Sequence, residues 1–340
     1  MNEVGRASSK APIAATLQLA LRARPFALLA AAIFLVAAPA VGAEYPEKPI
    51  RLIVPFVPGG GTDAIARLVA QKLEPALGQA VVVENIGGAG GTIAAEGVAR
   101  AAADGYTLLV GTESTHGTNS VRPIRYDPLK GFTPITLLAT SPTLFVAHPS
   151  VPANTTAELI AYAKANPGKL NFGSWGNASS THLALELFKA MSGTEITHIP
   201  YKGGGPAMTA IIAQEVDLAF QGLTITMPYV KAGRAKVIGV GGPKRVKLLP
   251  DVSTIAESGL PGFQMYTWFA VFAPPGTPQA IVDRLQREIA KVLALPDVQE
   301  KLQGLGMDII ASTPDELKAV VVSEVDKWQK LVRERKLTFE

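Results

Sequence analysis

The sequence predicts an α/β protein made of two similar units. Short apolar segments alternate along most of the chain with longer segments whose apolar residues recur every three to four positions. This order of strand and helix patterns implies mostly parallel sheets with helices on both faces. The 340 residues exceed what one core usually fills, and 48% of them are hydrophobic. We therefore expect two packed units rather than a disordered chain.

The first 43 residues have the layout of a secretory signal peptide. Lys10, Arg22 and Arg24 precede the uncharged apolar run Phe26–Ala38, and Val41-Gly42-Ala43 supplies a small-x-small cleavage pattern. The apolar run is shorter than the about 20 residues of a membrane span, although an uncleaved anchor is the alternative. We expect a soluble exported protein, cleaved after about Ala43.

Charge and cysteine content exclude several classes of function. Of the 32 basic and 28 acidic residues, four basic and one acidic residue lie in the leader, so the rest of the chain carries a net charge of +1. Nothing in that balance, and no basic run, indicates nucleic-acid binding. The absence of cysteine rules out disulfides, thiolate nucleophiles and cysteine-ligated metals.

The first unit has a β-α-β-α-β order. Ile65, Leu68 and Leu73 share one face of its first helix. The expected strands and helices, in chain order, are Ile50–Phe56, the helix Thr62–Leu77, Ala80–Glu84, the helix Thr92–Ala103, and Tyr106–Val110.

The second unit repeats this alternation, and a helical tail follows it. The expected strands are Thr143–His148, Leu170–Gly173, Ile196–Pro200, Val216–Phe220, Lys236–Val240 and Phe269–Ala273. The expected helices are Thr155–Asn166, Thr181–Met191, Pro206–Gln214, Pro278–Leu293, Asp297–Leu305 and one from Pro314 onward. We expect the chain to cross between the units near Ser141–Phe145 and Met265–Ala270, and the tail to pack back on the first unit.

A glycine-rich loop, Pro58-Gly59-Gly60-Gly61-Thr62-Asp63, joins the first strand to the first helix. The free N–H groups of a helix start and the helix dipole favour an anion there, with Thr62 or Asp63 as N-cap. Gly59, Gly61 and Ala64 also satisfy the dinucleotide pattern G-x-G-x-x-A, and Glu84 stands where a ribose-binding acid belongs. The proline beside the glycines and the export signal argue against a nicotinamide cofactor.

Three further loops have the same strand-to-helix setting. The loop Gly173–Thr181 is rich in small hydroxyl side chains, and Trp175 in it could cover a ligand or anchor the core. Tyr201–Pro206 is glycine-rich and carries Lys202, while Gly87–Gly91 suits a packing or hinge role. Two helix N-termini facing each other across a cleft would hold a carboxylate.

Catalytic and metal-binding motifs are missing. The histidines at 116, 148, 182 and 198 lack metal-ligand spacing; His182 and Glu186 share a helix face, but a local hydrogen bond explains that pair. No G-x-S-x-G nucleophile motif is present. We therefore expect binding without turnover, no metal and no cofactor, with a secreted hydrolase using a distant Ser/His pair as one alternative and a ligand-loaded sensor partner as another.

The sequence resembles the substrate-binding proteins of tripartite tricarboxylate transporters, the Bug family, over nearly the whole chain after the leader. The matching segments are Tyr45–Arg51, Val54-Pro55-Phe56, Pro58–Asp63, Val82–Asn85, Gly88–Gly91, Asp104–Leu109, Gly173-Ser174, His182-Leu183-Ala184, Pro200–Gly203, Val216-Asp217, Trp268, Leu249–Val252 and Ala273–Pro278. Trp175 departs from the small residue or proline usual in the family, and Glu113–Ser120 with Arg122 replaces a variable stretch.

The resemblance implies a two-lobed periplasmic binding protein of the flytrap type (type II), with two Rossmann-like lobes joined by hinge strands. The lobes would comprise residues 44–143 plus 268–340 and residues 144–267, after a signal peptide of residues 1–43. Such a monomeric periplasmic protein captures a small organic carboxylate and delivers it to the permease subunits in the membrane. The ligand-binding residues implied or expected here are Phe56, Gly60, Gly61, Thr62, Asp63, Ser174, Trp175, Ser179, Ser180, Thr181, Tyr201, Gly203, Gly204 and Asp217.

Overall fold

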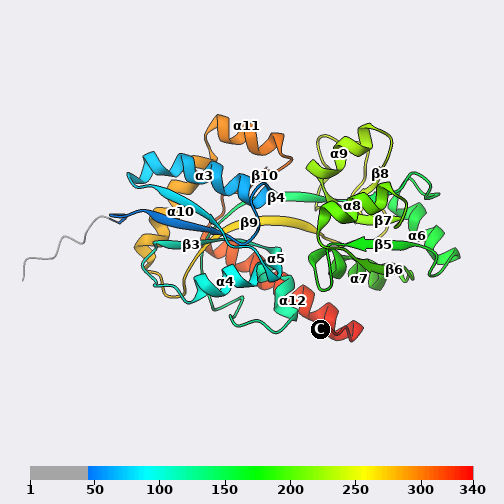
Figure 1. Cartoon of the computed structure of the whole chain (residues 1–340), viewed down its shortest axis with the longest axis horizontal. Coiled ribbons are helices and arrows are strands. Elements are labelled where there is room, and N and C mark those ends of the chain that lie inside the picture. The colour runs from blue at the N-terminus through cyan, green and yellow to red at the C-terminus, as the bar shows by residue number, and fades with distance from the viewer. Residues whose placement is uncertain (1–44, 340) are drawn as a thin grey trace, which may run out of the picture. The chain divides into compact units, whose positions relative to one another are not determined.

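One long strand connects two β-sheets, which we name sheet A and sheet B (Figure 1). In this computed structural model, which describes residues 45–339, strand β4 (Thr133–Ala147) pairs with β9 (Tyr266–Ala273) as far as Pro142. From Thr143 onward the same strand pairs with β7 (Leu218–Gly222) and β8 (Lys236–Val240). Each sheet with its helices forms one lobe, so the expected two-lobed α/β fold is confirmed.

Both sheets are mixed, with parallel strands on the side away from β4. Sheet A has the order β2-β1-β3-β9-β4, with β10 (Asp308–Ile309) on β4; its parallel strands are β1 (Ile50–Val54), β2 (Val81–Asn85) and β3 (Thr107–Thr112). Sheet B adds β5 (Asn171–Ser174) between β7 and β6 (Thr197–Pro200), all three parallel.

Helices cover both faces of each sheet. On sheet A, α3 (Gly61–Leu77) and α10 (Gln279–Leu293) pack together on one face, and α4 (Thr92–Ala99) and α12 (Pro314–Arg335) on the other. On sheet B, α6 (Thr156–Ala165) and α7 (Ser180–Ser192) oppose α8 (Gly204–Ile212) and α9 (Leu223–Lys231). The remaining short elements are α11 (Pro296–Gly304), α5 (Glu113–His116), η1 (Ala89–Gly91) and η2 (Thr118–Val121).

Strand alternation explains the two cores of the second lobe. Phe145 points to the face covered by α6 and α7, where its ring lies 4.6 Å from that of Phe220. Its neighbours Leu144 and Val146 point to the face covered by α8 and α9. Each fully buried side chain of this kind stabilises the fold by about 1.5–3 kcal/mol, so these faces fix the strand register.

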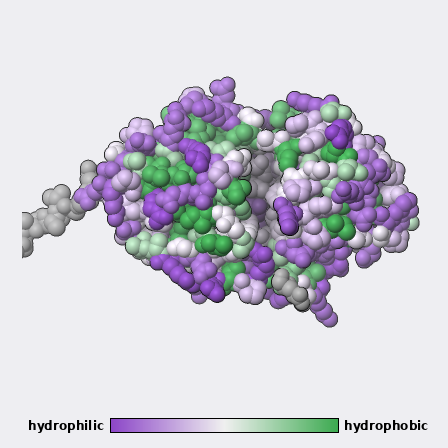
Figure 2. Space-filling model, viewed as in Figure 1, coloured by the Kyte–Doolittle hydropathy of each residue, from purple (hydrophilic) through white to green (hydrophobic). Residues whose placement is uncertain are grey.

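The carboxyl ends of the parallel strands in both sheets point toward the place where β4 changes sheets. In sheet A, the end of β3 at Thr112 pairs with Phe269, next to the part of β9 that pairs with Ser141 and Pro142 of β4. In sheet B, the end of β7 at Gly222 pairs with Thr143 of β4. The loops that follow these strands therefore face each other across the crossing, and Figure 2 shows the surface hollowed there.

The structure contains two features that the sequence did not predict. The sheet A half of β4 was not predicted, because Pro134 and Pro142 interrupt its apolar pattern and proline is unusual inside a sheet. Helix α9 was not predicted either, because Pro228 and threonines dilute its periodicity. The predicted leader and the position of its cleavage lie outside the described residues. Within those residues, no helix is long and apolar enough to cross a membrane.

Candidate functional site

Helices α3, α7, α8 and α9 all begin at the facing edges of the two sheets. No side chain caps α3, α8 or α9, whose N-caps are Gly60, Gly203 and Gly222. At α7, the hydroxyl of Ser179 caps a single N–H group, that of His182. The other first-turn N–H groups and the positive ends of the helix dipoles are thus directed at the space between the lobes, where they favour an anion.

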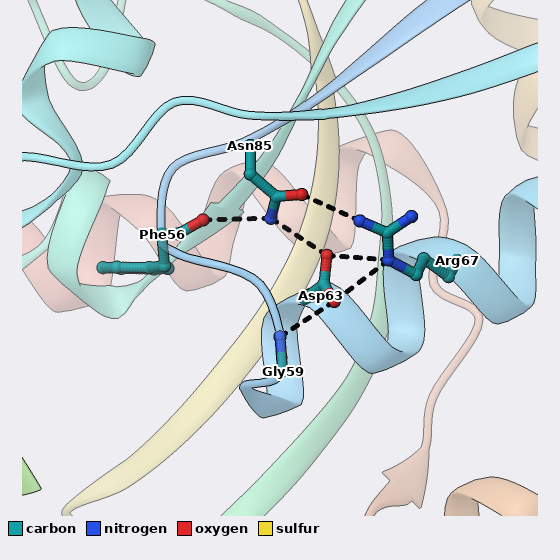
Figure 3. A network of polar contacts seen from close by, with 5 residues as sticks. All are labelled: Phe56, Gly59, Asp63, Arg67 and Asn85. Atoms are coloured by element: carbon teal, nitrogen blue, oxygen red, sulfur yellow. Dashed lines mark hydrogen bonds and ion pairs between the residues drawn. The ribbon is translucent and has the colours of Figure 1, made fainter.

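The glycine-rich loop Pro58–Asp63 between β1 and α3, which we name the first cradle, is held in place by Asp63 in the first turn of α3 (Figure 3). Its carboxylate accepts hydrogen bonds from the N–H of Gly59 at 3.0 Å, from Nε of Arg67 at 3.0 and 3.1 Å, and from Nδ2 of Asn85 at 2.9 Å. Asn85 also donates to the carbonyl oxygen of Phe56 at 3.0 Å. These bonds fix the loop between β1 and α3 against the end of β2.

The predicted N-cap role of Thr62 or Asp63 is therefore wrong. The cap is Gly60, whose extended backbone (ψ 172°) ends the loop, and Thr62 and Asp63 are the second and third residues of the helix. Burial alone would raise the pKa of Asp63, but the hydrogen bonds from Arg67, Gly59 and Asn85 outweigh it and hold this pKa below its usual range. Asp63 thus stays ionised, with its charge balanced by Arg67. Gly60 and Gly61 remain exposed beside it.

The loop Gly173–Thr181 between β5 and α7, which we name the second cradle, is held together by hydrogen bonds of Ser174 at the end of β5. Its hydroxyl lies 2.6 Å from Nε2 of His198 on the neighbouring strand, and it also exchanges hydrogen bonds with the backbone of Gly176 at 3.1 Å. Ser174 is fully buried. A serine and a histidine are therefore paired here, as the hydrolase alternative requires, but the hydroxyl is not presented to a substrate.

Two histidine rings stack beneath this cradle. The rings of His182 and His198 lie 3.6 Å apart and nearly parallel, and Nδ1 of His182 accepts a hydrogen bond from the N–H of Ala178. Burial lowers the pKa of both histidines to about 4. Both rings are therefore neutral near pH 7.

The other polar residues of the second cradle form hydrogen bonds with one another. The hydroxyl of Thr181 accepts the N–H of Trp175 at 2.9 Å and lies 3.1 Å from the hydroxyl of Ser179. Thr181 and Ser180 are buried, whereas Ser179 and Trp175 are partly exposed. Ser179 and Trp175 are thus the members of this loop that a ligand reaches most directly.

The third loop, Tyr201–Pro206, lies against Trp175 of the second cradle. The indole Nε1 of Trp175 is buried without a partner among the described residues, and a Cβ on Gly204 would lie 3.2 Å from it. Gly203 has a φ of +111°, a conformation that other residues rarely adopt. The hydroxyl of Tyr201 is directed to Glu215 at 3.4 Å, so only the ring of Tyr201 supports the loop.

The structure does not bring Asp217 to the other predicted residues. Its carboxylate accepts the N–H of Asn171 at 2.8 Å, at the start of β5, whereas Ser174 lies at the opposite end of that strand. Three residues of strand separate the two edges by about 10 Å. Asp217 therefore belongs to the edge of sheet B that faces away from the loops.

Several polar residues at these edges were not predicted as part of the site. Gln221, at the end of β7, is fully buried and donates to the carbonyl of Gly204 at 3.1 Å, while its Oε1 lacks a partner among the described residues. Ser114 and Asn119 both donate to the carbonyl of Gly90. A polar residue directly after an apolar strand was the available signal for Gln221.

The dinucleotide and metal alternatives find no support in the geometry. Both carboxylate oxygens of Glu84 accept hydrogen bonds from Arg51 at 2.7 Å, so the acid that a ribose would need is already engaged. Glu186 pairs with Lys189 rather than with His182. Over residues 45–339, no group of three or more acidic or histidine side chains could hold a metal ion.

Comparison with known proteins decides the family. Residues 65–337 match the model of the tripartite tricarboxylate transporter family receptors. This chain belongs to that family. The Bug resemblance is confirmed by the protein BugT of Bordetella pertussis, which is 36% identical to this receptor over 302 residues, 88% of this chain and 93% of BugT.

Two solved structures show the same fold with carboxylates. R. palustris Rpa4515, solved with adipate, is 38% identical with a TM-score of 0.75, and the match covers 85% of this receptor and 98% of that chain. MatC from Rhodopseudomonas palustris, solved with bound malate, is 35% identical with a TM-score of 0.73, covering 85% and 100%. Carboxylate binding is thus found in relatives of similar length and fold, and the family consists of receptors rather than known enzymes.

Proposed function

We propose that this receptor is exported to the periplasm, holds a small organic carboxylate between its two lobes and delivers it to the permease of a tripartite transporter. The observation that carries the proposal is the convergence of uncapped helix starts: α3 from sheet A and α8 and α9 from sheet B begin at facing edges. Their N–H groups would replace the water around a carboxylate without needing a charged side chain.

Closure of the lobes completes the proposed mechanism. We take the lobes as residues 44–143 plus 268–340 and residues 144–267, turning about the point where β4 changes sheets. Closure would bring Gly60, Gly61 and Thr62 toward Ser179, Trp175 and Gly204. The proposed role is binding and release by a monomer. Turnover is not part of this role, because the fully buried Ser174 is not placed as a nucleophile.

A thermal-shift screen of residues 44–340 against a panel of carboxylates tests the proposal. A ligand present at about 100 times its dissociation constant adds about 2.7 kcal/mol of stability, which raises the melting temperature by about 2 °C or more. We expect one class of acid to produce this shift, and NAD to produce none. A shift with NAD alone would contradict the proposal.

The side chain of Thr62 provides a matched pair of variants for the same screen. Thr62 is in the first turn of α3 and its hydroxyl has no partner among the described residues. Thr62→Val, which removes the hydroxyl but keeps the shape, should reduce the shift, and Thr62→Ser should preserve it. Equal shifts for both variants would remove Thr62 from the ligand site.

A further inference from the structure

The last helix of the first lobe reaches the second lobe. Helix α12 has 22 residues and is therefore about 33 Å long. Its part up to Val325 packs on sheet A through Leu317, Val321 and Val325. The rest of the helix continues past that sheet to contact α7, and Figure 1 shows the red C-terminal helix extending in this direction. Helix α12 therefore connects the lobes at a place where no strand crosses between them.

A buried apolar cluster forms the contact between α12 and α7. Trp328 and Leu331 of α12 pack with Leu183 of α7, and each of these side chains is at most 4% exposed. Leu187 of α7 and Val332 of α12 extend the cluster at its margin. Because the burial of apolar surface is the main favourable contribution to association, this contact holds the two lobes together.

The indole of Trp328 is fixed from the side of the first lobe. Its Nε1 donates to Oε2 of Glu324 at 3.0 Å, and Nζ of Lys327 lies 4.3 Å from the centre of its ring. A Cβ on Gly117 would lie 3.2 Å from the same indole, so the glycine at this position lets the ring approach the backbone closely. Trp328 thus presents a firmly held ring to Leu183 of the second lobe.

The end of the chain turns back toward the start of α7. Lys336 has a left-handed backbone (φ 51°), and the N–H of Leu337 donates to the carbonyl of Val332 at 3.1 Å, which ends α12 and reverses the chain. The reversal brings the ring of Phe339 to 5.5 Å from that of His182, edge to face. His182 lies in the first turn of α7, so the last residues of the chain contact the helix that begins at the second cradle.

Residues 328–339, which we name the strap, lie apart from the point where β4 changes sheets. Helix α7 turns Ala184, Leu185 and Phe188 toward sheet B, whereas Leu183 faces α12. The thickness of α7 therefore separates the strap from β4. Two bodies joined at a single place can turn in any direction, but a second, separate attachment limits them to turning about the line between the two.

We propose that the strap is a second attachment between the lobes, which restricts their movement to rotation about the line from the strap to the crossing of β4. This restriction keeps the helix starts of the two lobes directed at each other before a ligand is bound. Less freedom of motion is then lost when the lobes close. The inference concerns the movement of the lobes and holds whichever ligand is bound.

Distance measurements between spin labels test the inference. The chain has no cysteine, so Gln71→Cys on α3 and Ala157→Cys on α6, both at exposed positions, place a single label on each lobe. Pulsed electron paramagnetic resonance of the doubly labelled residues 44–340, without ligand, measures the distribution of distances between the lobes. We expect one narrow distribution while the strap is intact.

Two variants weaken the strap without altering the core of either lobe. Val332→Asn places an amide at the margin of the apolar cluster, and Phe339→Ala removes the ring that contacts His182. Both should broaden the distance distribution, whereas Thr338→Ala, at the exposed neighbouring position, should leave it unchanged. Far-UV circular dichroism identifies the variants that are folded, and Phe339→Ala keeps the test decisive if Val332→Asn does not fold, because Phe339 is partly exposed and follows the end of α12. Superimposable distributions for Phe339→Ala and Thr338→Ala, or a broad distribution in the unmodified protein, would overturn the inference.

Discussion

The hydroxyl of Ser174, at the end of β5, and Nε2 of His198 on the adjacent parallel strand β6 lie 2.6 Å apart. In a hydrolase such a pair would activate the serine, but here the serine is buried and its oxygen also bonds the backbone of Gly176. The pair instead ties the second cradle to β6. The stacked ring of His182 extends this contact into the first turn of α7.

We predict that the receptor loses stability as the pH falls from about 6.5 to about 4. The pKa values of His182 and His198 are lowered to about 4 by burial, so between these limits the unfolded chain binds more protons than the folded chain. Each histidine then contributes less than the about 1.4 kcal/mol of lost stability per pH unit that a fully buried group would give, because both rings are partly exposed and solvent screens their charge. Urea unfolding across this range measures the slope.

A single substitution identifies the source of that slope. His198→Asn should flatten it, because this variant removes one of the two groups whose pKa is lowered by burial. An unchanged slope in His198→Asn would show that the stacked pair does not govern the acid sensitivity.

Glu113 should have the opposite pH dependence. It is almost fully buried at the start of α5, its Oε2 has no partner within residues 45–339, and burial raises its pKa to about 8. The folded chain therefore binds a proton that the unfolded chain releases between about pH 4.5 and pH 8, which lowers stability as the pH rises. Glu113→Gln should match the unmodified protein at pH 5 and exceed its unfolding free energy at pH 8. Equal stabilities at both pH values would contradict the prediction.

The Asp63 network predicts unequal costs for its two charged members. Asp63→Ala leaves the N–H of Gly59, the amide of Asn85 and the Arg67 guanidinium without their acceptor, and should lower the unfolding free energy by about 1–3 kcal/mol. Arg67→Met should cost less, because the arginine side chain is 52% exposed and Asp63 keeps its other donors. Denaturant titration of both variants measures the difference, and a larger loss for Arg67→Met would reverse our assignment of Asp63 as the centre of the network.

The sequence identified most of the elements because their patterns are local. The strand before the first glycine loop and the helix after it follow directly from buried apolar residues such as Leu52 and Leu68. The loops of the candidate site were recognisable because glycine and small hydroxyl residues stand between a strand and a helix. The expected position of Asp217, in contrast, came from a family motif and not from its place on a strand, and the register of β5 and β7 puts it at the far edge.

Contacts between distant segments explain what the sequence did not show. Arg122 meets Ala89 across 33 residues, and Ser114 meets Gly90 across 24. The change of sheet within β4 lies between Pro142 and Thr143, inside the expected crossing at Ser141–Phe145, but its partners β9 and β7 come much later in the chain. No local pattern encodes such pairings.

The most direct test of carboxylate capture by helix N–H groups uses Gly61, the first residue of α3. Gly61→Pro removes one N–H at a position where proline fits a helix, and the extended backbone of Gly60 suits a residue before proline. Gly61→Ala is the matched control, because it keeps the N–H. Its Cβ would meet the flexible end of Met307 at 3.3 Å and the ring of Phe269 at an ordinary contact distance of 3.6 Å. Calorimetry with the acid found in the screen should show nearly unchanged affinity for Gly61→Ala and a loss of about 10-fold or more for Gly61→Pro. Equal affinities of Gly61→Pro and Gly61→Ala would contradict capture of the carboxylate at the start of α3.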